Sequence, residues 1–216
     1  FKHDAADPMS IGNNFIRVLY EDADGLIWIG TNVGVYIYNP ETENFRKFDV
    51  ATERGDVISR EVSSIKCDSS GDLWIGVNWQ GVFRYDRRDE SLELYEPVPG
   101  DTTSLSSVHV WDLCFDGDGN LWVGSQNGGL DRYDRETDRF VRHRLKGLSD
   151  VSRIVLDKQN QLLLGTMKDG LFSFNPYMGT CQPLLLDSGH KDLFVRAIFV
   201  RNSREVVVGT ENGIYI

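Results

Sequence analysis

A short residue pattern returns five times along this 216-residue chain, and the repetition limits what the chain can fold into. Each copy opens a turn, places an apolar residue six positions later and a glycine two positions after that. The turn positions lie 41 to 48 residues apart and are Asp22, Asp68, Asp116, Asp157 and Arg201. Self-similarity at a period of this size predicts structural units that pack on their sequence neighbours.

The apolar position is a tryptophan in the first three copies and an aliphatic residue in the last two. In chain order these residues are Trp28, Trp74, Trp122, Leu163 and Val207. The glycines that follow are Gly30, Gly76, Gly124, Gly165 and Gly209, and a second set is Gly34, Gly81, Gly129, Gly170 and Gly213. Each copy holds short apolar runs between turn residues, such as "LIWIG" and "VYIYN", which predicts four strands of about five residues each.

A four-stranded unit with a period of about 45 residues is typical of a β-propeller blade. We therefore predict an all-β protein of antiparallel four-stranded blades, in which tryptophan and other aromatic residues fill the layer between blades. The whole of residues 1–216 is expected to be one propeller segment, with residues 1–4 as the tail of a preceding blade. The predicted repeats are approximately 14–50, 62–97, 110–146, 151–186 and 195–216.

Composition narrows the classes of partner. The formal net charge of −10 argues against nucleic-acid binding, because that affinity comes mostly from Lys and Arg neutralising phosphates. No apolar run approaches the roughly 18 residues that span a bilayer, and no signal peptide is visible. The chain begins and stops within the repeat pattern, so we expect a piece of a longer protein. The three cysteines, Cys67, Cys114 and Cys181, show no metal-binding spacing, and their redox state stays open.

Three segments of the chain share one sequence pattern: "DADGLIWIGTNVGVYIYN", "DSSGDLWIGVNWQGVFRYD" and "DGDGNLWVGSQNGGLDRYD". This pattern resembles the two-component regulator propeller repeat. The segment Ser104-Leu105-Ser106 resembles the residues that precede the first strand of that repeat. The fourth copy lacks the turn glycine and the tryptophan, and the fifth also lacks the aspartate. The resemblance covers essentially the whole chain.

In that family the repeats build tandem, commonly seven-bladed propellers that form the extracytoplasmic sensor of hybrid histidine kinase/response-regulator proteins. Many of these sensors detect breakdown products of polysaccharides. The resemblance implies an arc of a larger propeller, although a closed five-bladed ring is the alternative. It also implies a periplasmic receptor segment without a cofactor, a homodimer formed through the full sensor, and membrane attachment through another part of the protein.

The ligand-binding face should carry the loops between second and third strands and the links between blades, because blades converge there into a concave mouth. Trp79 stands in such a loop, outside the tryptophan position of the repeat. It could stack on a sugar ring while Asn78 and Gln80 bond hydroxyl groups. The alternative is that Trp79 covers a neighbouring blade or a dimer partner.

The first strands offer a second set of candidates. Period-two alternation would point alternate residues toward the central channel, where an acidic sugar or another anion could bind. The candidates are Arg17, Trp111, Arg153 and Arg196. The alternative is a solvated channel lining whose arginines pair with the chain's many acids.

Three classes of function remain after these steps. The first is a sensor module that binds an oligosaccharide or similar solute and does not change it. The second is an interaction or dimerisation propeller without a small ligand. The third is a propeller lyase or glycosidase, for which the sequence shows neither a carboxylate pair for acid–base work nor a nucleophile motif. We predict no catalytic residue and no metal site in this segment, and a histidine kinase as the whole protein.

Overall fold

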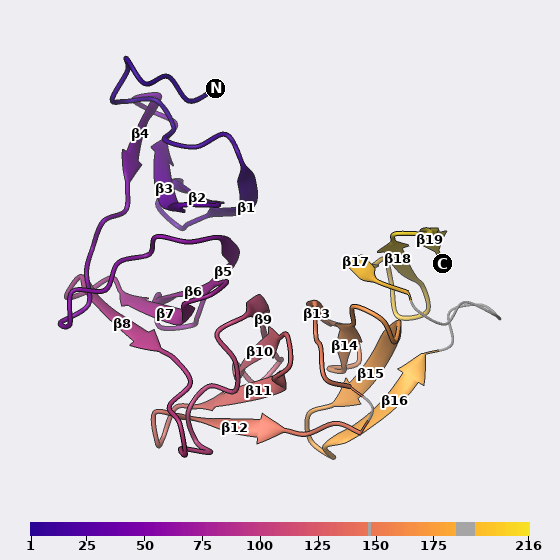
Figure 1. Ribbon diagram of the computed structural model, residues 1–216. Coiled ribbons are helices and arrows are strands. Elements are labelled where there is room, and N and C mark those ends of the chain that lie inside the picture. The colour runs from indigo at the N-terminus through magenta and orange to yellow at the C-terminus, as the bar shows by residue number, and fades with distance from the viewer. Residues whose placement is uncertain (147, 185–192) are drawn as a thin grey trace. The chain divides into compact units, whose positions relative to one another are not determined.

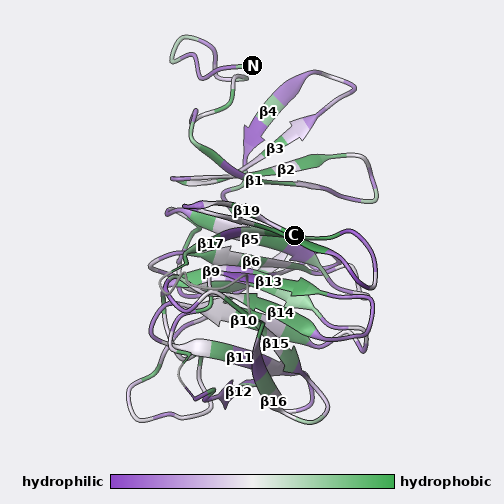
Figure 2. Ribbon diagram, turned by 90° about the vertical axis from the view of Figure 1, so that its right-hand side faces the viewer, coloured by the Kyte–Doolittle hydropathy of each residue, from purple (hydrophilic) through white to green (hydrophobic). Residues whose placement is uncertain are grey.

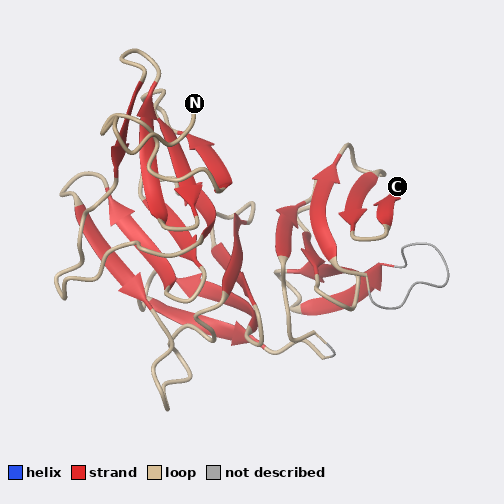
Figure 3. Ribbon diagram, turned by 45° about the horizontal axis from the view of Figure 1, so that its top comes forward, coloured by secondary structure: helices blue, strands red, loops and turns tan. Residues whose placement is uncertain are grey.

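The computed structural model describes residues 1–146, 148–184 and 193–216. Throughout these residues the secondary structure consists of strands, turns and loops, with no helix (Figure 3). The strands form five antiparallel sheets in which each strand pairs with the next one along the chain (Figure 1). We call these sheets blades 1 to 5. The predicted all-β class and the four-stranded blade are confirmed for blades 1 to 4, and blade 5 has three strands.

The blades follow the repeats in order. Blade 1 comprises β1 (Ile16–Glu21), β2 (Ile27–Thr31), β3 (Gly34–Asn39) and β4 (Asn44–Lys47). Blade 2 comprises β5 (Val62–Cys67), β6 (Leu73–Val77), β7 (Gly81–Asp86) and β8 (Ser91–Tyr95). Blade 3 comprises β9 (Val110–Phe115), β10 (Leu121–Ser125), β11 (Gly129–Asp134) and β12 (Arg139–His143).

Blade 4 comprises β13 (Arg153–Leu156), β14 (Leu162–Gly165), β15 (Leu171–Asn175) and β16 (Thr180–Leu184). Blade 5 comprises β17 (Val195–Val200), β18 (Val206–Thr210) and β19 (Gly213–Tyr215). The end of the predicted fourth repeat, residues 185–186, lies outside the described residues. Residues 1–4 form no strand, and the Phe1 ring packs against Tyr38 and Phe45.

The chain divides into two compact units. Unit 1 holds residues 1–96 and 108–110, and unit 2 holds residues 97–107 and 111–216. Within unit 1, Trp28 of blade 1 shares a buried core with Val62 and Ile65 of blade 2. Within unit 2, Trp122 of blade 3 shares a core with Ile154 of blade 4. Hydrophobic residues gather in the strands (Figure 2), and the predicted tryptophan layer between blades is confirmed in both units.

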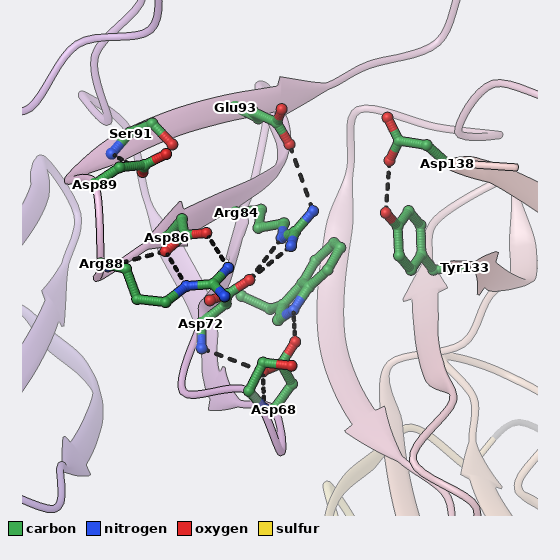
Figure 4. Close-up of polar contacts among 12 residues, drawn as sticks. Asp68, Asp72, Arg84, Asp86, Arg88, Asp89, Ser91, Glu93, Tyr133 and Asp138 are labelled. Atoms are coloured by element: carbon green, nitrogen blue, oxygen red, sulfur yellow. Dashed lines mark hydrogen bonds and ion pairs between the residues drawn. The ribbon is translucent and has the colours of Figure 1, made fainter. Parts of the chain in front are cut away.

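The aspartate that opens each turn also holds the tryptophan that follows. Asp22 Oδ1 accepts the backbone N–H of Leu26, as expected for a turn cap, while Oδ2 accepts the Trp28 indole N–H at 2.8 Å. The pairs Asp68–Trp74 and Asp116–Trp122 repeat this bond at 3.1 and 2.8 Å (Asp68 in Figure 4). A buried indole N–H needs a partner, so the aspartate makes the tryptophan compatible with the core.

Blade 2 carries a further buried carboxylate next to this bond. Asp72 is 1% exposed and accepts two hydrogen bonds at Oδ2, from Arg84 Nε at 2.9 Å and Nη2 at 2.7 Å (Figure 4). The Arg84 guanidinium also lies over the Trp74 ring, with 5.6 Å between the guanidinium carbon and the ring centroid. The charge of Asp72 is thereby paired inside the blade, which gives this cluster a structural explanation.

A glycine in the second strand lets adjacent blades approach closely. A Cβ at Gly124 would lie 2.8 Å from Val151 Cγ1, and one at Gly165 would lie 2.6 Å from Val195 Cγ1. Both valines belong to the start of the next blade. At these two positions the glycine is therefore required by packing between blades, since a side chain there would overlap the next blade.

Candidate functional site

A β-bulge, and not simple alternation, sets the direction of two first-strand candidates, Arg17 and Arg196. The pairing of β1 with β2 shifts between Ile16 and Val18, and that of β17 with β18 shifts between Val195 and Ala197. Arg17 and Arg196 are the extra residues at these shifts. The prediction that period-two alternation orients them is wrong, because a bulge inserts an unpaired residue and re-aims its side chain.

Arg17 lies at the loop end of blade 1. Its Nε donates to Asn32 Oδ1 at 2.7 Å, and its Nη2 lies 3.3 Å from Glu61 Oε1. Asn32 belongs to the β2–β3 loop and Glu61 directly precedes β5 of blade 2. The structure thus brings the first-strand arginine to the loop face expected for ligands, and an acid and an amide already occupy part of its guanidinium.

The β6–β7 loop presents Trp79 on the same face of unit 1. Trp79 is 62% exposed and has a φ of 69°, a left-handed conformation that bulky residues rarely adopt. Its backbone N–H donates to Val108 O at 2.9 Å, and its ring stands edge-on to His109, with 4.0 Å between the ring centroids. Asn78 is buried beside it, and its Oδ1 lies 3.2 Å from His109 Nδ1.

Gln80 faces the segment that leads into blade 2. Its Oε1 accepts the backbone N–H of Ser59 at 3.0 Å, and its Nε2 donates to Val57 O at 3.0 Å. Both ends of this side-chain amide are therefore used inside the protein. In this loop the Trp79 ring is exposed to solvent, and Asn78 contacts His109. Gln80 holds the segment that precedes blade 2.

The remaining candidates lie in unit 2. Arg153 Nε donates to Arg196 O at 2.7 Å, which ties blade 4 to blade 5. The Arg196 guanidinium lies over the Phe194 ring and pairs with Glu211 of the β18–β19 loop. Trp111 is half-buried, and its indole N–H is buried without a hydrogen-bond partner in the described part of the chain.

Blade 3 contains a cluster that the sequence analysis did not identify. Asp131 of β11 is fully buried, and its Oδ2 accepts the backbone N–H of Ser106 at 2.8 Å and the Ser106 hydroxyl at 2.6 Å. Its cross-strand partner Arg142 donates to the carbonyls of Asp101, Ser104 and Leu105 at 2.9 to 3.1 Å. We call this arrangement the linker clasp, defined by Asp131, Arg142 and residues 101–106.

One carboxylate oxygen of Asp131 in the linker clasp accepts no hydrogen bond from the described residues. Among the described residues, Asp131 Oδ1 is buried without a hydrogen-bond partner. Burial raises the pKa of Asp131 to about 6 from 3.8, although the Ser106 bonds and Arg142 act in the opposite direction. The other four copies carry aromatic residues at this place, namely Tyr36, Phe83, Phe172 and Tyr215. A carboxylate in an otherwise aromatic position of the repeat is the sequence signal that could have revealed the clasp.

The arrangement of the candidate residues is suited to binding. Trp79 supplies an exposed ring, and the bonds of Asn78 and Gln80 to other parts of the chain hold the loop that carries it. Within residues 1–146, 148–184 and 193–216, no cluster of three His, Cys, Asp or Glu side chains could hold a metal ion. Cys67, Cys114 and Cys181 are free thiols. The described chain contains no helix that is long and apolar enough to cross a membrane.

Comparisons with known proteins agree with the repeated sequence pattern. The profile of the family described as two component regulator propeller matches residues 10–33 and 104–127. Each match runs from the lead-in segment through the first and second strands of a blade. No curated protein sequence matches the chain.

Solved structures resemble the chain over nearly its whole length. The extracellular domain of BT4673 from B. thetaiotaomicron, assigned to a hybrid two component system, has a TM-score of 0.84 and 21% identity, over 99% of this chain and 30% of that one. The corresponding domain of BT3049 from the same organism has a TM-score of 0.82 and 24% identity, over 99% and 28%. This chain therefore spans less than a third of either domain.

A propeller enzyme also shares the architecture. Virginiamycin B lyase from Staphylococcus aureus has a TM-score of 0.67 and 13% identity, over 94% of this chain and 69% of the lyase. At such identities the likeness concerns the fold, which serves binding proteins and enzymes alike. The profile matches identify two component regulator propeller repeats at residues 10–33 and 104–127, and the structural likeness shows a β-propeller fold.

Proposed function

We propose that this chain is a segment of an extracytoplasmic, periplasmic sensor that binds an oligosaccharide or a similar solute and signals to a histidine kinase of a hybrid two-component system. The repeats support this proposal, as does the likeness to extracellular domains of such systems in B. thetaiotaomicron. In this proposal the segment binds without catalysis, and the kinase belongs to the rest of the protein.

The observation that carries the proposal is the conformation of Trp79. A positive φ in a bulky residue costs on the order of 1–3 kcal/mol, and residues strained in this way cluster at functional sites. The strain here holds a large ring in solvent, above a histidine that is itself braced by Asn78. A sugar ring could stack on the indole, while Arg17 Nη1, which is not used in the contacts with Asn32 and Glu61, bonds a hydroxyl group.

Signalling would follow from a shift in population. A solute favours one arrangement of the sensor over another only through a difference in its affinity for the two. The full sensor, as a homodimer, would supply those two arrangements. The loops around Trp79 would supply the contacts that differ between them.

Calorimetric titration of the full sensor with neutral and acidic oligosaccharides tests the proposal. We expect saturable binding that Trp79→Ala weakens about tenfold or more, the loss of roughly 1.4 kcal/mol that one stacked ring provides. Tyr177→Ala removes a similarly exposed aromatic ring from the β15–β16 turn and should leave binding unchanged.

Trp79→Gly separates binding from stability. Glycine adopts a positive φ without strain, so this variant should unfold at a higher temperature than the native protein. Its affinity for the saccharide should be as low as that of Trp79→Ala, because both variants lack the indole. If both Trp79 variants bind the saccharide with native affinity, the indole is not part of the binding site. Binding by neither the native sensor nor any variant, across the panel, would count against a saccharide receptor.

The second candidate function is an interaction or dimerisation module, and one surface of unit 1 favours it. Phe15, Ile16 and Leu19 are exposed on β1 and the residue before it. Beside them lies an apolar cavity of about 250 Å³ that is lined in part by Ile11, Ile29 and Phe45. Variants of this surface that abolish dimerisation of the full sensor but leave solute binding intact would favour the second function.

A further inference from the structure

A second cavity lies in unit 2 beside the linker clasp. Its volume is about 360 Å³, and it is bounded by the β10–β11 turn, the end of β12 and the segments on either side of blade 3. The polar residues that line it are Ser106, Asn127, Arg142, His143, Arg144 and Ser149. Neither Asp nor Glu is among the described residues of the lining, although the whole chain has a net charge of −10.

The lining contains cationic groups that the protein does not fully use. Among the residues that the structure describes, Arg144 has no hydrogen-bond or ion-pair partner. Arg142 bonds the linker through Nε and Nη2, and its Nη1 takes part in none of those bonds. A guanidinium binds a carboxylate through paired N–H donors, so the two side chains together fit a carboxylate-bearing ligand.

The unpartnered polar atoms in the described part of blade 3 include one on His143, which lies between the two arginines in sequence, and one on Ser125 of β10. His143 Nε2 and Ser125 Oγ are buried without hydrogen-bond partners in the described residues. The Ser106 and Ser125 hydroxyls both face Gly128, where a Cβ would collide with them, so a glycine keeps this wall of the cavity open. Burial, and secondarily Arg132, lowers the pKa of His143, which leaves the ring neutral with one donor and one acceptor nitrogen.

The same cavity is closed on one side by apolar residues. Leu145 and Leu148 complete the lining, and Leu148 is buried in the core between blades 3 and 4. The Asn127 backbone N–H donates to Asp150 Oδ1 at 2.9 Å, which fixes the turn and leaves the side-chain amide of Asn127 available. The site therefore combines cations, neutral hydrogen-bonding groups and an apolar floor, as small-molecule sites usually do.

We propose that this cavity binds a small hydroxylated carboxylic acid. The carboxylate contacts Arg144 and Arg142 Nη1, and the hydroxyl groups bond the Asn127 amide and His143. The Asp131 carboxylate does not line the cavity and is held by Ser106. This site belongs to unit 2, and the inference stands without the proposed function of Trp79.

Glucuronate and glucose make a matched pair of probes, because they share a ring and differ in the carboxylate. Calorimetric or NMR titration of the 216-residue chain should give saturable binding of glucuronate, with glucose weaker by about tenfold or more. Arg144→Ala should weaken glucuronate by about tenfold, which corresponds to one charge-assisted hydrogen bond. Arg204→Ala removes another exposed arginine, in the β17–β18 turn, and should change nothing.

Asn127→Asp provides an independent check. Asn127 has a φ of 59°, and aspartate tolerates that conformation, so the variant should fold and place a negative charge at the cavity. Glucuronate should then bind more weakly while the melting temperature stays near the native value. Equal affinity for glucose and glucuronate, unchanged glucuronate affinity in Arg144→Ala, or no saturable glucuronate binding at millimolar concentration would each overturn the proposal.

Discussion

At the scale of single residues, Trp79 and Asp131 depart from what the other copies of the repeat carry. Trp79 places a bulky side chain at a positive φ, in a loop where the first and last copies have Asn-Val and Glu-Asn. Asp131 places a carboxylate where the other copies have an aromatic ring. Each departure carries a free-energy cost: Trp79 is a bulky residue at a positive φ that Asn127 adopts in the same loop of blade 3, and Asp131 is a buried carboxylate. Such costs are expected at functional positions, where local rules of stability give way to binding.

The buried carboxylate of Asp131 should make stability depend on pH. Its pKa is raised to about 6 in the folded chain, so between pH 4 and 6 the folded state holds more protons than the unfolded state. This group stabilises the fold fully below the unfolded pKa, and its contribution is lost as pH rises through about 6. The total loss is about 3 kcal/mol at about 1.4 kcal/mol per pKa unit.

Asp131→Asn removes the titration and keeps an oxygen that can accept the Ser106 bonds. The variant should gain stability relative to the native chain as pH rises from about 4 to about 6, and the difference should be constant above that. Urea unfolding at a series of pH values measures it. Asp118→Asn, in a turn, serves as the control. A difference that does not vary with pH would mean that Asp131 does not titrate in this range.

At the scale of elements, much of each blade could be predicted from the sequence. The aspartate, glycine and tryptophan spacing located the turn and the second strand, because turn chemistry and core burial act within a few residues. The bulge in the first strand was missed, although its signal was present. Val62 and Ile65 are both buried but stand three positions apart, and alternation places only residues two apart on one face.

The candidate site was less accessible to sequence reasoning. The loop that presents Trp79 could be recognised, since an extra aromatic residue interrupts the repeat. The fastening role of Gln80 could not, because its partners Val57 and Ser59 lie in a linker without any periodic pattern. The linker clasp was missed for the same reason. Contacts between a blade and an irregular segment depend on a chain path that local preferences do not specify.

The close contact between blades predicts different outcomes for two glycines of the same repeat position. Gly165→Ala should destabilise the chain by about 1–3 kcal/mol, because its Cβ would lie 2.6 Å from Val195 Cγ1 and overpack the contact. In Gly209→Ala the nearest atom would be 3.6 Å away, so this matched substitution should be neutral or slightly stabilising. Denaturant unfolding of both variants measures the difference. Equal effects would show that the glycine is not kept for blade packing.

At the scale of the whole molecule, blade 1 leaves uncovered a face that other blades bury. Leu19 is 64% exposed, whereas Ile65 and Ile154, at the same place in blades 2 and 4, are 2% and 3% exposed. Those two residues contact the preceding blade of their own unit. The same surface chemistry on β1 therefore fits a blade-like partner, such as another copy of the chain.

The isolated chain should associate with itself through this face. Leu19→Glu is expected to lower the apparent mass at high protein concentration without lowering the melting temperature, because the side chain is already in water. Sedimentation velocity measures the change. Val141→Glu alters another exposed apolar residue, on β12, and should leave association as it was. Persistent association of the Leu19 variant would place the contact elsewhere.

The glycine between blades also bears on how such a chain can diverge. The tryptophan of the repeat is replaced by Leu163 and Val207 in the last two copies, yet all five copies keep the glycine two residues later. At Gly30, Gly124 and Gly165 a Cβ would overlap a valine of the next blade, so close packing at those three places depends on the glycine as well as on the core side chains. Duplicated repeats can therefore change their core side chains and acquire new loops while each blade still packs on its neighbour in the same way. Evolution can then alter one blade at a time.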